Sequence, residues 1–145
     1  MDLVAFIKEK LFNKAAPLPA GVYHYASPPE VEKPYRYHLR IEPSGDGILI
    51  INASTVLHLN HTAAEYAYHL VKGHTPDETL QAMAPRYNIP PDSIKEDFKS
   101  FTENLFNLLK TPDLDPVTFF DLERAVPYGQ RSSAPYRLDC ALTYR

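Results

Sequence analysis

The sequence has a single cysteine, Cys140, and no tryptophan among its 145 residues. One thiol cannot form a disulfide within the chain, and it is too few for a cysteine-rich zinc or iron–sulfur site. Long apolar runs are also missing. The run at residues 48–51 is far shorter than the roughly 20 residues of a membrane-spanning helix. The composition therefore argues against a disulfide scaffold, a cysteine-bound cluster and a transmembrane helix.

An excess of basic charge is missing as well. The chain has fifteen Lys and Arg residues and eighteen Asp and Glu residues, for a formal net charge of −3. Proteins that bind nucleic acid through its phosphates are usually basic, so this balance argues against a nucleic-acid partner. Glu9 and Lys10 interrupt the apolar stretch at residues 3–7, so no cleavable signal pattern opens the chain. We expect a soluble cytoplasmic protein with no membrane partner.

Proline is abundant, with fourteen residues, and its positions divide the chain. Prolines crowd both ends, which predicts an N-terminal helix with a Pro-rich extended arm over 1–34, a folded domain over 35–111 and an extended tail over 112–145. Residues 2–13 have apolar side chains at helical spacing. A helix this short needs a docking surface, either on its own domain or on another chain.

Three short strands are predicted at the start of the folded domain. Residues 35–42, YRYHLRIE, alternate apolar and polar side chains, which indicates a half-buried antiparallel strand. Residues 43–47 have the Pro, Ser, Asp and Gly composition of a hairpin loop. The return strand follows at 47–53 and a third strand at Thr55–Leu59.

Three helices are predicted after the strands. Each is marked by a Ser or Thr three positions before a Glu, the spacing of a helix capping box: Thr62 with Glu65, Thr75 with Glu78, and Ser93 with Glu96. Gly73 is placed to end the first helix, the second reaches about Met83, and the third is the longest and reaches about Lys110. Strands followed by helices indicate an α+β fold, similar in size and order to a small winged-helix domain.

The sequence shows no enzyme signature. His58 and His61, like His69 and His74, have no cysteine or acidic residue at a metal-ligand spacing, and we interpret all four as facing solvent. Cys140 lies between leucines and is interpreted as a buried strand thiol. The tail carboxylates lie in a segment broken by prolines, where no rigid pocket holds them. We therefore expect no catalytic residue, metal or cofactor in this chain.

The features for binding a peptide are stronger. An exposed sheet edge is a template for an incoming strand, and the third strand, Thr55–Leu59, is a candidate for such an edge. On the long helix, Phe106 projects outside the apolar stripe, close to Thr102 and Leu109 and rimmed by Lys95 and Lys99. Phe106 is therefore a candidate floor for a peptide groove. The alternative is that it packs under the N-terminal helix or the C-terminal tail.

Three stretches together resemble the PqqD-like family: residues 57–66 with Gly73, residues 74–78, and residues 94–105. Members of this family recognise the precursors of ribosomally made, modified peptides, and the resemblance covers about 35–110. In the family, a leader peptide adds as a strand beside the third strand and lies against the third helix. The resemblance and the groove argument together give these candidate peptide-binding residues: Thr55, Val56, Leu57, His58, Leu59, Lys95, Lys99, Thr102, Phe106 and Leu109.

The tail adds a second resemblance. Residues 113–117 and 133–145 are similar to the segment that leads into the barrel of a radical S-adenosylmethionine enzyme. In those enzymes a Cys-x-x-x-Cys-x-x-Cys motif follows and binds an iron–sulfur cluster, but this sequence stops at Arg145, and Cys140 does not match a cluster cysteine. The resemblance implies a recognition domain whose cluster and S-adenosylmethionine belong to a separate or missing catalytic part. A tail without its barrel is expected to be disordered or to pair with a second copy, as a homodimer.

Three functional hypotheses follow. The first is a peptide-recognition module that binds a leader by strand addition and delivers it to a radical S-adenosylmethionine enzyme, with Lys95 and Lys99 favouring an acidic peptide. The second is an assembly or dimerisation domain, which predicts that the strand edge is already occupied in the protein alone. The third is a DNA-binding winged helix. Its argument is weak because acidic residues balance the lysines of the long helix.

Overall fold

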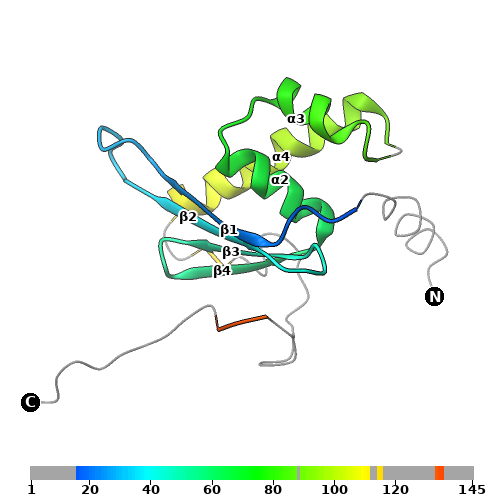
Figure 1. Cartoon of the computed structure of the whole chain (residues 1–145). Coiled ribbons are helices and arrows are strands. Elements are labelled where there is room, and N and C mark those ends of the chain that lie inside the picture. The colour runs from blue at the N-terminus through cyan, green and yellow to red at the C-terminus, as the bar shows by residue number, and fades with distance from the viewer. Residues whose placement is uncertain (1–15, 88, 112–113, 116–132, 136–145) are drawn as a thin grey trace, which may run out of the picture.

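The computed structural model describes residues 16–87, 89–111, 114–115 and 133–135. These residues form, in chain order, β1 (Gly21–Ala26), β2 (Arg36–Ile41), β3 (Gly47–Ile51), β4 (Thr55–Leu59), α2 (His61–Val71), α3 (Pro76–Met83) and α4 (Pro91–Lys110). The strands form one antiparallel sheet in the order β1-β2-β3-β4, and the helices lie over one of its faces (Figure 1). The α+β class predicted from the sequence is confirmed.

The sheet has four strands among the described residues, where the sequence predicted three. The additional strand, β1, lies in the segment that the prolines marked as an extended arm. It pairs with β2 along its whole length, from Gly21 opposite Ile41 to Ala26 opposite Arg36. Its side chains alternate between half-buried and exposed, which is the period of a strand. The prediction missed β1 because the prolines on both sides of it indicated a segment without sheet pairing. The helix expected at 2–13 lies outside the described residues.

Two turns set the register of the remaining strands. The loop predicted at 43–47 is confirmed: Gly45 has a φ of +94°, and its N–H donates to the Glu42 carbonyl at 2.9 Å. The turn between β3 and β4 places Asn52 and Ala53 at positive φ, so β3 ends at Ile51, earlier than predicted. Asn52 also accepts a hydrogen bond from the Arg36 N–H at 2.8 Å, which ties this turn to the start of β2.

Only one of the three predicted capping boxes is present. Thr75 and Glu78 form the full reciprocal pair at the start of α3. Asn60, not Thr62, caps α2, because the Asn60 side chain accepts from the Ala63 N–H at 2.9 Å. The third helix, α4, begins at Pro91 with no side-chain cap, ahead of the predicted start. The Ser/Thr-to-Glu spacing therefore located all three helices, but for α2 and α4 it indicated the wrong cap.

The core has two parts. The first lies between the sheet and the helices, where buried side chains of β2 and β3 such as Leu39 and Leu49 pack with Leu105 of α4. The second lies among the helices and contains Tyr66, Met83, Tyr87, Ile94 and Phe98. The apolar stripe predicted on α4 is confirmed, because Ile94, Phe98, Leu105 and Leu108 are all buried. Within the described residues, no helix combines the length and apolarity that crossing a membrane requires.

The tail residues 133–135 contact β2 and the turn that follows it. Arg40 donates hydrogen bonds to the carbonyls of Ala134 and Pro135, at 2.6 and 3.2 Å. Glu42 pairs with Arg40 at 2.7 Å and accepts from the Ser133 N–H at 3.0 Å. Burial alone would raise the pKa of Glu42, but the hydrogen bonds from Ser133 and the charge of Arg40 outweigh it and lower that pKa. Arg40 and Glu42 therefore bind the backbone of residues 133–135 through two of its carbonyls and one N–H.

Glu65, predicted as a capping residue, is instead buried in the helical layer and only 1% exposed. Its Oε2 accepts a 2.6 Å hydrogen bond from the Tyr87 hydroxyl. Arg86 Nε lies 2.7 Å from the other carboxylate oxygen, although the better directed hydrogen bond runs from Nη2 to Oε2 at 3.3 Å. Burial and the hydrogen bond to Glu65 raise the pKa of Tyr87, so its hydroxyl remains a donor. This network joins the start of α2 to the segment that follows α3.

Glu65→Ala is expected to lower the free energy of unfolding by about 3 kcal/mol or more, because it leaves the buried Tyr87 hydroxyl and Arg86 without their shared partner. Tyr87→Phe is expected to cost about 1.5–3 kcal/mol. Urea denaturation measures both, and Glu96→Ala, at an exposed acid of α4, is the matched control with little effect. A Glu65→Ala protein as stable as this control would contradict the network.

Candidate functional site

The strand β4 is the outermost strand of the sheet on one side. Among the described residues it pairs only with β3, from Thr55 opposite Ile51 to Leu59 opposite Gly47. Leu57 is buried beneath the helices, whereas Thr55, Val56 and Leu59 are half-buried. The His58 side chain is exposed and takes part in a further interaction. The five strand residues predicted for a peptide site therefore lie together at one sheet edge.

The two candidate lysines of α4 are engaged by acidic side chains. Lys95 forms an ion pair with Asp77 of α3. Lys99 Nζ lies 3.8 Å from Glu103 one turn further along the helix. Exposed pairs of this kind are weak, but each one offsets a positive charge. The attraction for an acidic peptide predicted from these lysines is correspondingly smaller.

The other α4 candidates differ in surroundings. Leu109 is half-buried and packs against the sheet-side core. The Thr102 hydroxyl donates to the Phe98 carbonyl of its own helix at 2.8 Å. Phe106 is 44% exposed and does not belong to the core, as its position on the helix predicted. Thr102 and Phe106 both line a pocket on the helical side of the sheet.

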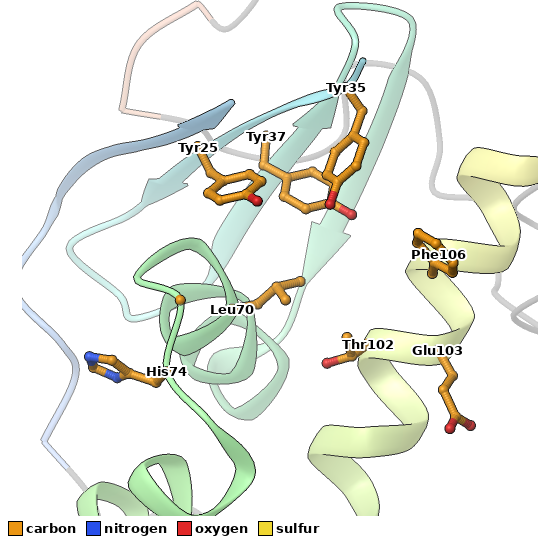
Figure 2. A pocket seen from close by; sticks show the side chains of 9 residues that line it. Tyr25, Tyr35, Tyr37, Leu70, His74, Thr102, Glu103 and Phe106 are labelled. Carbon is orange, nitrogen blue, oxygen red and sulfur yellow. The ribbon is translucent and has the colours of Figure 1, made fainter. Parts of the chain in front are cut away.

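This pocket, which we call the tyrosine pocket, has a volume of about 420 Å³. It opens between the ends of β1 and β2, the C-terminal end of α2 and the C-terminal half of α4 (Figure 2). Its lining residues are Tyr25, Tyr35, Tyr37, Leu70, Gly73, His74, Thr102, Glu103 and Phe106. Figure 2 shows the three tyrosine rings along the sheet end, with Phe106 across from them on α4.

The three tyrosines form a packed wall. The ring centroids of Tyr35 and Tyr37 are 5.2 Å apart, and those of Tyr25 lie 5.9 and 6.0 Å from them. Burial raises the pKa of Tyr37, and burial followed by the hydrogen bond with Tyr25 raises the pKa of Tyr35. These hydroxyls therefore remain protonated and uncharged at neutral pH. The wall offers ring faces and hydroxyl oxygens, with no charge of its own.

The structure divides the predicted site into two parts. None of the β4 candidates lines the tyrosine pocket, which lies toward β1 and β2, while Thr102 and Phe106 do line it. Sequence reasoning missed the tyrosines and His74. Tyr25 is directly opposite Tyr37 in the sheet register, and this pairing depends on β1, which the prediction did not include. Ten tyrosines in the chain were the available signal, but composition does not place them side by side.

Four of the six histidines are arranged in two pairs. His69 is buried, at 4% exposure, so its predicted position facing solvent is wrong. Its Nδ1 lies 2.8 Å from Nδ1 of His74, at the edge of the tyrosine pocket. His24 and His38 form a similar contact of 2.7 Å across β1 and β2. Over the part of the chain that the structure describes, no three His, Cys, Asp or Glu side chains gather closely enough to hold a metal ion.

Comparison with known proteins does not assign this chain to a family or a function. No family model matches it, no curated protein matches it, and no solved structure matches it. The site is therefore interpreted from its own residues and from the sequence resemblance.

The burial of His69 predicts a stability that depends on pH. Burial lowers the pKa of His69 from 6.5 to about 4; the charge of Glu65 raises it and that of His74 lowers it. Above about pH 6.5 the histidine is neutral in both the folded and unfolded states. Below that value the unfolded chain binds a proton that the folded chain excludes, until about pH 4. Stability is therefore lost on acidification through this window.

We expect unfolding free energy to fall by on the order of 2 kcal/mol between about pH 7.5 and pH 5 because of this one histidine. Urea denaturation at several pH values measures the slope. His69→Gln is expected to reduce it, whereas His58→Gln, at an exposed position, serves as the matched control. An unchanged slope in His69→Gln would show that other groups cause the acid sensitivity.

Proposed function

We propose that this chain binds the leader of a ribosomally made precursor peptide and presents it to a radical S-adenosylmethionine enzyme. The observation that carries the proposal is the position of β4 as the outermost strand of the sheet, immediately before α2. The edge of such a strand that faces away from the sheet has backbone donors and acceptors at the spacing that an extended peptide matches. The sequence resemblance to PqqD-like recognition domains supports this mode and supplies the class of peptide.

The physical basis of the binding is shared between backbone and side chains. Backbone hydrogen bonds along β4 contribute affinity that depends little on peptide sequence. The half-buried Val56 and Leu59 provide apolar contact at the same edge and help to set register. The winged-helix-like arrangement, the absence of a catalytic role and a cytoplasmic location belong to the same proposal. The enzyme partner gains from a higher local concentration of its substrate.

Assembly of the chain with a further part of the enzyme is a second candidate function. In that case the chain would have no peptide ligand of its own, and its strand edge would already be occupied. Among the described residues β4 pairs only with β3, and residues 133–135 contact Arg40 and Glu42 within the same chain, so these observations do not favour assembly over peptide binding. DNA binding is not supported, since Lys95 and Lys99 of α4 are both close to carboxylates.

Strand addition predicts an alternating response to backbone methylation of the peptide. Leaders of the small precursor peptides encoded beside the gene are titrated against the full chain, and the best binder is then N-methylated at one position at a time. In an edge pair, each strand directs its N–H groups at the partner from every second residue. Methylation at alternate positions is therefore expected to weaken binding by about tenfold or more, and at intervening positions by little. A uniform response would contradict strand addition.

The same peptide identifies which edge it uses. A nitroxide label on the leader is expected to broaden the backbone NMR signals of β4, at Val56 to His58, and to spare those of β1, at Val22 to His24. The strand β1 is the matched control because it is the other outermost strand of the described sheet. Broadening at β1 instead of β4 would transfer the binding site to that edge. Absence of binding by every leader would reject the peptide-recognition function.

A further inference from the structure

The lining of the tyrosine pocket includes an acidic side chain and no lysine or arginine. Of its nine lining residues, Glu103 is the only acidic one. His74 is at the pocket edge, with its Nδ1 directed to His69. Lys99 Nζ lies 3.8 Å from the Glu103 carboxylate, but this pair is exposed and therefore weak. A carboxylate or phosphate in the pocket would meet Glu103 without a lysine or arginine among the lining residues. The charge of the lining therefore favours a cationic occupant.

Several polar atoms of the pocket can accept hydrogen bonds, and the tyrosine hydroxyls among them can also donate. The Glu103 carboxylate can only accept when it is ionised. The Thr102 hydroxyl already gives its hydrogen to the Phe98 carbonyl, so toward the pocket it retains acceptor capacity. The hydroxyls of Tyr35 and Tyr37 end close together at the pocket, as Figure 2 shows. An aliphatic side chain would leave these acceptors without donors, whereas a guanidinium group has five N–H donors.

The ring faces of this protein already attract its own cations. Lys110 Nζ lies 4.2 Å from the centroid of the Phe106 ring. At the C-terminal end of α2, Lys72 Nζ lies 5.3 Å from the centroid of the Tyr23 ring and 5.7 Å from that of the Tyr68 ring. These distances are within the range of cation–π interactions. An arriving cation would find Phe106 on one side, the tyrosine wall on the other and Glu103 nearby.

We propose that the tyrosine pocket binds an arginine side chain of the partner peptide, with the guanidinium between Phe106 and the tyrosine wall and paired with Glu103. The identity of the peptide as a precursor leader rests on the function proposed above. The preference of the pocket for arginine rests on its lining residues alone. A peptide strand added beside β4 would lie three strand spacings, roughly 14 Å, from β2. The arginine therefore belongs to a residue that flanks the segment paired with β4, and the pocket adds a sequence preference that backbone pairing lacks.

The pocket is tested first without any leader. The full chain is titrated with N-acetyl-arginine amide, and with N-acetyl-citrulline amide as a probe of nearly the same shape without the charge. We expect the arginine probe to shift the ring NMR signals of Tyr25, Tyr35 and Tyr37 with millimolar affinity, and the citrulline probe to bind at least about fivefold more weakly. Equal binding of the two probes, or stronger binding of N-acetyl-leucine amide, would overturn the proposal.

A pair of matched variants then locates the charge. Glu103→Gln is expected to weaken the arginine probe by about three- to fivefold. Glu96→Gln makes the same change at an exposed residue of α4 outside the pocket and is expected to leave binding unchanged. Lys110→Gln is expected to strengthen binding, because it removes a competing cation from the Phe106 ring. Equal losses of affinity for the arginine probe in Glu103→Gln and Glu96→Gln would show that only the net charge of the protein matters. That result would reject the pocket as the binding site.

The leader titration separates this proposal from the one on which it rests. Replacing each arginine of a bound leader with citrulline should weaken binding at one position, and Glu103→Gln should reduce that difference. A leader that binds β4 with no such position would reject the arginine pocket and leave the peptide function standing. If the pocket binds the arginine probe but no leader binds the chain, the proposed leader recognition is rejected and the proposed arginine pocket is retained.

Discussion

The alternation of side chains in the sheet is the constraint on which the rest of the structure depends. In β2, Tyr37, Leu39 and Ile41 are buried, while Arg36, His38 and Arg40 lie on the other face. A slip of one residue would exchange the two sets, so the register is fixed by the burial of one face. The helices α2 and α4 cover that face and form the sheet-side core with it. Every site described above takes its position from this division.

The two faces of the sheet serve different purposes. On the helical side, the alternation brings Tyr25 and Tyr37 together at the end of the sheet, where α4 passes with Phe106. Tyr37 belongs both to the core and to the pocket lining, so the buried face of the sheet continues into the pocket. From the opposite face of β2, Arg40, together with Glu42 in the following turn, binds the backbone of residues 133–135. The β4 edge, the tyrosine pocket and the contact with residues 133–135 therefore lie at three separate places.

The helical layer is fixed by polar contacts as well as by apolar packing. Glu65 links α2 to Arg86 and Tyr87 after α3, and Asp77 links α3 to Lys95 of α4. The first contact is buried and the second is at the surface, so they differ in what they contribute. The buried one has the larger effect, because Glu65 and the Tyr87 hydroxyl would otherwise lie in the protein interior without this hydrogen bond. Its effect reaches the site by holding α2, whose C-terminal end lines the pocket.

The sequence by itself determined the features that depend on neighbours along the chain. The strand at β2, the hairpin at Gly45, the box of Thr75 with Glu78 and the buried stripe of α4 follow from local period and turn chemistry. Only the tertiary structure decided that β1 joins the sheet, that Glu65 faces Tyr87, and that Tyr25 and Phe106 line one pocket. Those contacts join residues far apart in sequence. Their partners are chosen by how the layers pack, and no local pattern contains that information.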